Sequence, residues 1–154
     1  MLATSLVTPF FDAYYLEGKV RASDSFAVVA NTSYLTLANA GWKNRAGTLG
    51  VGAEYFFRGN ALRGWYAEVI GEVWFSSWRQ DSSGTAAPHS LGTAGIALIG
   101  YQFVFGPGFA VDLGAGAVGV HLPAAHAEVD GTRVSSQPFT KIYPAAKINV
   151  GWAF

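Results

Sequence analysis

The sequence contains no cysteine among its 154 residues. Disulfide bridges, thiol nucleophiles and cysteine-ligated metal sites are therefore excluded. Charge is also scarce, because charged residues make up 13% of the chain, about half the usual share. The ten basic and ten acidic residues cancel formally, which argues against a nucleic-acid partner, since nucleic acids select basic surfaces.

A long apolar run is absent as well. The mean hydropathy is high, at +0.25, yet no stretch of roughly 18 residues is free of polar groups. The most apolar region, 91–123, is interrupted by Gln102, Gly106-Pro107-Gly108 and Asp112. Hydrophobicity spread in this way favours barrel strands over membrane helices. No basic segment follows Met1, so a signal peptide is not evident and we expect a mature form.

The end of the chain alternates between two kinds of side chain. From Ala146 to Phe154 one parity is aliphatic or aromatic, and the other is small or polar and includes Lys147 and Asn149. A period of two predicts a strand with different surroundings on its two faces. In a transmembrane barrel the apolar face contacts lipid and the polar face lines the lumen. In a soluble, lipocalin-like barrel the faces are reversed around a ligand.

The same alternation predicts seven strands, at 7–22, 26–37, 47–57, 65–78, 91–105, 109–122 and from 139 onward. Single-chain bacterial barrels have an even number of strands, starting at eight. We therefore predict an all-β, antiparallel, up-and-down barrel of about eight strands, formed by residues 1–154 as one domain. The first two strands are expected within 1–22. An N-terminal strand missing from the sequence, or one hidden in a connection, remains an alternative.

The connections alternate between short and long, as they do in outer-membrane barrels. The long ones, at 38–46, 79–90 and 123–137, are predicted to be outer loops. Within the last of them, Asp130-Gly131 predicts a hairpin turn.

The polar parity predicts a charge network inside the barrel. With the apolar parity outward, the lumen receives Glu17, Lys19, Arg21, Glu54, Glu68, Glu72, Gln102, Asp112, Lys147 and Asn149, together with Asn31 and Lys141. We expect these groups to be paired, because unpaired buried charges cost several kcal/mol each. A proton or ion pathway along Glu54, Glu68 and Glu72 is the functional alternative. Glu68 and Glu72 are roughly 13 Å apart along a strand, too far for a paired acid and base.

Aromatic residues gather near the predicted strand ends. Such residues suit the membrane interface of a barrel, and the candidates are Trp65, Trp74, Tyr101, Phe103, Phe109, Trp152 and Phe154. An ordinary soluble core is the alternative explanation. The low charge of the chain favours the membrane, because so few charged residues make a poor water-facing surface.

The alternating strands and the terminal Phe154 resemble the small bacterial outer-membrane barrel superfamily, of the OmpA transmembrane domain, OmpX and OmpW types. The resemblance implies an outer-membrane location, contact with lipopolysaccharide, and recognition of the C-terminal strand by the barrel insertion machinery. It also implies a plugged lumen and outer loops that contact a surface or a protein partner. A structural rather than catalytic role is expected, with a narrow channel for small solutes as the alternative.

A lipid A-modifying enzyme is a further alternative, because barrels that resemble this one include lipid A acylases and deacylases. These use a serine with a histidine and a carboxylate, for which His126, Glu128 and Ser135 or Ser136 are candidates here. The His-x-Ser pattern of the deacylases is absent. We therefore predict no catalytic residue, and neither a metal nor a cofactor.

Overall fold

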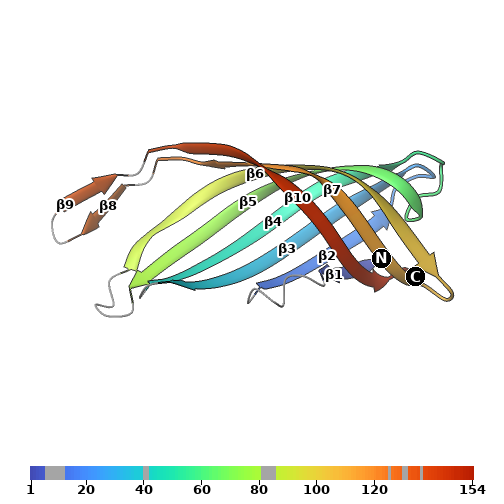
Figure 1. Cartoon of the computed structure of the whole chain (residues 1–154), viewed down its shortest axis with the longest axis horizontal. Coiled ribbons are helices and arrows are strands. Elements are labelled where there is room, and N and C mark those ends of the chain that lie inside the picture. The colour runs from blue at the N-terminus through green and yellow to red at the C-terminus, as the bar shows by residue number, and fades with distance from the viewer. Residues whose placement is uncertain (6–12, 40–41, 81–85, 125, 130–131, 136) are drawn as a thin grey trace.

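The chain forms a closed antiparallel β-barrel (Figure 1). The computed structural model describes residues 1–5, 13–39, 42–80, 86–124, 126–129, 132–135 and 137–154. The strands are β1 (Leu2–Ser5), β2 (Ala13–Arg21), β3 (Phe26–Asn39), β4 (Trp42–Phe56), β5 (Gly64–Gln80), β6 (Ala86–Phe105), β7 (Phe109–Leu122), β8 (His126–Val129), β9 (Thr132–Ser135) and β10 (Phe139–Trp152). Eight of them close the barrel in the order β1-β10-β7-β6-β5-β4-β3-β2, whereas β8 and β9 form a separate two-stranded sheet. This confirms the predicted fold class.

Among the described residues there is no helix of the length and hydrophobicity needed to cross a membrane.

The first two strands lie within residues 1–22, as predicted, but the single strand predicted at 7–22 is wrong. β1 ends at Ser5 and β2 begins at Ala13, and the residues between them, 6–12, lie outside the described part of the structure. β1 closes the barrel, because Leu2 pairs with Gly18 of β2 on one side and with Trp152 of β10 on the other. Both chain ends consequently lie at the same end of the barrel as the turns 22–25, 57–63 and 106–108 (Figure 1). We call this end the turn end, and the opposite end, which carries β8 and β9, the loop end.

Two of the predicted loops are shorter than expected. The predicted loop 38–46 is wrong, because β3 and β4 remain in register up to the pair Asn39 and Trp42. β6 likewise begins at Ala86, inside the predicted loop 79–90. A strand ladder satisfies backbone hydrogen bonds whatever the side chains are, so polar residues in these segments did not stop the pairing. The hairpin predicted around 130–131 is confirmed by the antiparallel pairing of β8 with β9, although residues 130 and 131 themselves lie outside the described residues.

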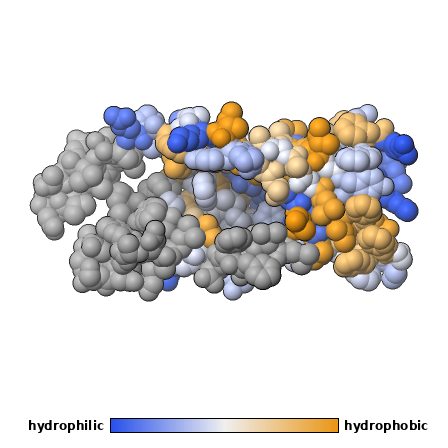
Figure 2. Space-filling model, viewed as in Figure 1, coloured by the Kyte–Doolittle hydropathy of each residue, from blue (hydrophilic) through white to orange (hydrophobic). Residues whose placement is uncertain are grey.

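The wall of the barrel has an apolar outer face and a polar inner face. Val51, Val69 and Ile99 point outward and are 60% exposed or more, whereas Glu54 and Glu68 point inward and are at most 2% exposed. Figure 2 shows hydrophobic residues over the described part of the wall near the turn end, with hydrophilic residues at its tip. The period of two along each strand produces this separation.

The turn 57–63 folds over the turn end of the lumen. Ala61 donates a backbone hydrogen bond to the Asp24 carbonyl at 2.7 Å and packs with Phe56 and Tyr66. Leu62 has a positive φ of 72°, and its carbonyl accepts a hydrogen bond from Gln102 Nε2 at 2.5 Å. A left-handed backbone is unusual for a residue with a branched side chain. The hydrogen bond from Gln102 on the inner face of the barrel stabilises this conformation and holds the turn over the lumen.

Candidate functional site

A cluster of polar side chains lies inside the barrel near the turn end. It consists of residues from six strands, and all of them are buried: Glu17, Lys19, Glu54, Tyr66, Glu68, Gln102, Asp112, Lys147 and Asn149. We call this set the luminal cluster. Strand register brings its members to one level, because Glu54 pairs with Glu68 and Asp112 pairs with both Gln102 and Asn149.

Lys19 lies at the centre of the luminal cluster. Its Nζ donates to Asp112 Oδ2 at 2.6 Å and to Gln102 Oε1 at 3.1 Å. It also donates to Glu54 Oε1 and lies 3.4 Å from Glu17 Oε1. The single ammonium group of Lys19 therefore connects β2 with β4, β6 and β7 across the lumen.

Lys147 provides the second ammonium group. Its Nζ lies 2.6 Å from Glu68 Oε2, 3.0 Å from Glu17 Oε2 and 3.1 Å from Asp112 Oδ2. Glu54 Oε1 is farther away, at 3.6 Å. Since removing one partner of a buried ion pair leaves an uncompensated charge, the four carboxylates depend on both lysines.

Tyr66 packs between the two lysines and the glycines of the wall. Its hydroxyl donates to Asp112 Oδ1, and the two Nζ atoms lie 5.2 Å (Lys19) and 5.7 Å (Lys147) from its ring centroid. A Cβ on Gly100 would overlap the Tyr66 ring and hydroxyl. The absence of a side chain at Gly100 therefore makes room for the phenol of Tyr66.

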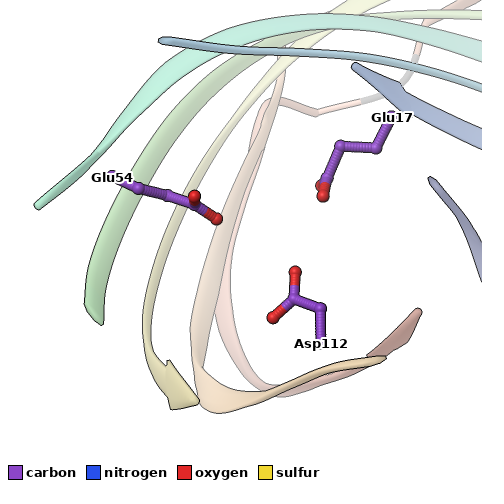
Figure 3. A group of neighbouring side chains, drawn as sticks. All are labelled: Glu17, Glu54 and Asp112. Carbon is purple, nitrogen blue, oxygen red and sulfur yellow. The ribbon is translucent and has the colours of Figure 1, made fainter. Parts of the chain in front are cut away.

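Three carboxylates of the cluster converge from different strands. Figure 3 shows Glu17, Glu54 and Asp112 pointing toward one another, and one oxygen from each lies within 4.8 Å of the others. Such a group could in principle hold a metal ion. Here the Lys19 ammonium already pairs with all three carboxylates, so it takes the place that a cation would occupy.

The luminal cluster carries more negative than positive groups. Four carboxylates face two ammonium groups, a formal excess of two negative charges. Two buried oxygens, Glu54 Oε2 and Glu68 Oε1, have no hydrogen-bond partner among the described residues. The two unsatisfied oxygens occur on the same side of the cluster, where Glu54 and Glu68 pair across β4 and β5.

A second polar group lies next to the cluster toward the loop end. Asn31 donates to Glu72 Oε1 at 2.8 Å, and Tyr15 donates to Glu17 Oε2 at 2.6 Å. The Asn31 amide is also 3.4 Å from the Tyr15 hydroxyl. Glu72 is therefore held by an amide rather than by a lysine.

Two of the cations predicted inside the barrel are exposed and do not join the luminal cluster. Arg21 is the last residue of β2, where the wall ends, and its exposed guanidinium pairs with Asp24 in the adjacent turn. Lys141 is exposed near the loop end and lies 5.3 Å from the Phe139 ring centroid. The luminal cluster therefore has two lysines in place of the four cations predicted from the sequence.

The predicted aromatic set divides into two parts. Trp74 does not belong to the outer face, because it shares the inward parity of Glu68 and Glu72 on β5. The others form an outer girdle near the turn end, together with neighbouring aromatic residues of the same face: Phe26, Tyr55, Phe57, Trp65, Tyr101, Phe103, Phe105, Phe109 and Trp152. Phe154 follows β10 and is 92% exposed.

The residues considered for lipid chemistry are only partly described. His126 and Ser135 pair through their backbones in the β8–β9 sheet. The side chains of His126, Glu128 and Ser135, and the whole of Ser136, lie outside the described part of the structure. His121 Nδ1 lies 2.8 Å from Thr140 Oγ1 at the exposed end of β7.

Tyr66 and Tyr15 are members of the luminal network that the sequence reading did not single out. Both share the inward parity of a predicted luminal carboxylate on the same strand, namely Glu68 and Glu17. Parity places both tyrosines on the luminal face, but the luminal set predicted from the sequence contains only charged and amide side chains.

No family model matches this chain, and comparison with curated proteins and with solved structures finds no match either.

Proposed function

We propose that this protein is an integral β-barrel of the bacterial outer membrane, with a lumen plugged by side chains and a structural or surface-interaction role rather than a catalytic one. The observation that carries the proposal is the inverted distribution of polarity. Glu17, Glu54 and Asp112 are fully buried inside the barrel, whereas Val20 and Ile142 on its outer face are more than 70% exposed.

This distribution is unfavourable for a protein surrounded by water. Soluble monomers rarely expose contiguous apolar patches larger than a few hundred Å², and buried ions are costly unless they are paired. If lipid surrounds the wall, the exposed apolar face is favourable, because it contacts hydrocarbon instead of water.

Aromatic residues at two levels support a membrane of ordinary thickness. The outer girdle lies near the turn end, and a second group on the outer face lies toward the loop end: Tyr14, Tyr34 and Phe75. Trp65 and Phe75 are ten residues apart on β5, roughly 33 Å along the strand. At the usual strand tilt this spacing corresponds to about 25 Å along the barrel axis, the height of the apolar band of outer-membrane barrels.

The long strands support an outward orientation of the loop end. β5 has 17 residues and β6 has 20, whereas about 9–11 suffice to span a bilayer. In this proposal the excess length and the β8–β9 sheet project from the cell, where they would contact lipopolysaccharide or a partner protein. The C-terminal strand would be recognised by the barrel insertion machinery.

A charge substitution on the outer face tests the proposal. Val51→Arg places a cation within the apolar band, and in lipid vesicles it should destabilise the barrel by about 2–4 kcal/mol. Asn60→Arg, in the exposed turn 57–63, is the control and should have little effect. Stability is measured by urea unfolding of refolded protein, and folding is followed by the faster gel migration of unboiled samples.

A soluble protein would behave differently. If the chain stays folded and monomeric in buffer without detergent, and Val51→Arg costs no more than Asn60→Arg, the outer face meets water and the proposal is wrong.

A further inference from the structure

Glu54 and Glu68 form a pair of facing carboxyl groups on the inner face of the barrel. They stand in register on β4 and β5, and both side chains are almost fully buried. A lysine binds one oxygen of each, because Glu54 Oε1 accepts from Lys19 and Glu68 Oε2 accepts from Lys147. In the described part of the chain, no nitrogen or hydroxyl group donates to the other two oxygens, Glu54 Oε2 and Glu68 Oε1.

The two lysines use their N–H bonds on other acceptors. An ammonium group has three N–H bonds, and Lys19 directs them to Glu54 Oε1, Gln102 Oε1 and Asp112 Oδ2. Lys147 Nζ likewise has three carboxylate oxygens within 3.1 Å. Neither ammonium group therefore has an N–H bond to spare for the remaining oxygens of the pair.

The neutral donors of the luminal cluster are engaged as well. The Tyr66 hydroxyl donates to Asp112, and the amides of Gln102 and Asn149 donate to acceptors outside the pair. The two facing carboxyl groups are instead hydrogen-bonded to each other. Ionised carboxylates are acceptors only, so a hydrogen bond between them requires that one of the two carries a proton.

We propose that Glu54 and Glu68 share one proton, held between Glu54 Oε2 and Glu68 Oε1, and that the stability of the luminal cluster depends on it. One proton gives both oxygens a partner, and it reduces the formal excess of negative charge in the cluster from two to one. Like charges in facing positions of a ladder are destabilising. The inference goes beyond the proposed function and concerns the lumen alone, whatever surrounds the outer wall.

The groups around the pair do not compensate a second negative charge. The neighbouring strands on either side present apolar residues, because β3 pairs Ala27 with Glu54 and β6 pairs Leu98 with Glu68. The titratable groups of the cluster that surround the pair are Glu17 and Lys19 on β2, Tyr66 on β5, Asp112 on β7 and Lys147 on β10. The two lysines among them are balanced formally by the two further carboxylates, so the charge of the pair itself is left over.

The shared proton makes stability depend on pH in a defined direction. In the unfolded chain a glutamate is ionised above about pH 5, so near neutral pH the folded chain binds one proton more than the unfolded chain. Stability therefore decreases as the pH rises. Release of one proton on unfolding raises the unfolding equilibrium constant by about tenfold per pH unit, until the folded pair loses the proton too.

Infrared spectroscopy of the full chain, refolded in a non-ionic detergent, detects the proton directly. A protonated carboxyl has a C=O stretching band that is separate from the carboxylate and amide bands, and we expect this band in the wild type at neutral pH. Because the proton is shared, Glu54→Gln and Glu68→Gln should each remove the same band. A wild-type spectrum without the band, as expected if a water molecule is the donor, or a band unchanged by either substitution, would overturn the proposal.

Glu72→Gln is the matched control for these substitutions. Glu72 lies on the same face of β5 as Glu68, but it accepts from Asn31 outside the pair. The band that is removed by Glu54→Gln and by Glu68→Gln should persist in this variant. Loss of that same band in Glu72→Gln would assign the proton to another carboxyl and overturn the proposal.

Urea unfolding at a series of neutral to alkaline pH values tests the dependence on the proton. Relative to Glu68→Gln, the unfolding constant of the wild type should rise by up to about tenfold more per pH unit, and Glu72→Gln should behave as the wild type does. If Glu68→Gln does not fold, Glu54→Gln takes its place, and the infrared band of the wild type requires neither variant. Equal pH dependence in the wild type and in a folded variant of the pair would overturn the proposal.

Discussion

Glu54 and Glu68 stand directly opposite each other on the inner face of the β4–β5 ladder. Like charges in directly opposed positions are destabilising, and both side chains are almost fully buried. Each carboxylate has its own ammonium partner, because Lys19 donates to Glu54 and Lys147 donates to Glu68. The pair is therefore maintained by cations that come from two strands on other parts of the barrel.

Replacement of Lys147 tests how far the carboxylates depend on that arrangement. Lys147→Met leaves the four cluster carboxylates with one ammonium group, and we expect a loss of about 3–5 kcal/mol in the free energy of unfolding. Urea titration in detergent micelles measures it. The matched control is Lys141→Met on the same strand, whose exposed ammonium should contribute less than about 1 kcal/mol.

If both lysine variants lose the same small amount of unfolding free energy, the ion pairs of Lys147 do not stabilise the barrel. Addition of Glu68→Gln to Lys147→Met should recover part of the loss, because one uncompensated charge is then removed.

Tyr66 should contribute through its hydroxyl as well as its ring. Tyr66→Phe removes the hydrogen bond to Asp112, and we expect a loss of about 1.5–3 kcal/mol because the acceptor is charged and buried. Asp112→Asn weakens the same interaction, so the double variant should cost clearly less than the sum of the single ones. Additive losses would show that the two groups are energetically independent. Tyr55→Phe, on the outer face, serves as the control for loss of a phenol.

Much of this arrangement follows from the alternation in the sequence. A strand places every second side chain on the same face, so parity alone located Glu54, Glu68, Asp112 and Lys147 on one surface. Parity gives no position along the barrel axis, and this explains Arg21: it has the luminal parity but lies where the wall ends.

Distances across the lumen could not be predicted. Lys19 and Asp112 are separated by 93 residues, and their contact depends on the strand order and register of the closed barrel. The short β1 was similarly hidden, because four residues are too few to display a convincing alternation. Its two hydrogen-bonded neighbours define it, and they lie at opposite ends of the chain.

Two glycines in the same ladder should respond oppositely to alanine. A Cβ on Gly52 would overlap the backbone of Val69 and Ile70, whereas a Cβ on Gly71 would meet no atom within 4 Å. We expect Gly52→Ala to cost about 1–3 kcal/mol through overpacking. Gly71→Ala should be neutral or stabilising by up to about 1 kcal/mol, because alanine loses less backbone entropy. Urea unfolding of both variants checks this, and a penalty at Gly71 equal to that at Gly52 would contradict the explanation by local space.

Phe154 should affect assembly without affecting the folded barrel. The side chain is 92% exposed beyond the end of β10, so it buries little surface and Phe154→Ala should change the free energy of unfolding by no more than about 0.5 kcal/mol. If the insertion machinery recognises the C-terminal strand, the same variant should accumulate less in the outer-membrane fraction of cells that express the chain with a signal peptide. Phe57→Ala, an exposed aromatic at the same end of the barrel, controls for general loss of an interfacial ring. Equal membrane fractions for wild type and Phe154→Ala would remove the terminal residue from recognition, whereas a large loss of stability in refolded Phe154→Ala would show that its role lies in the folded state.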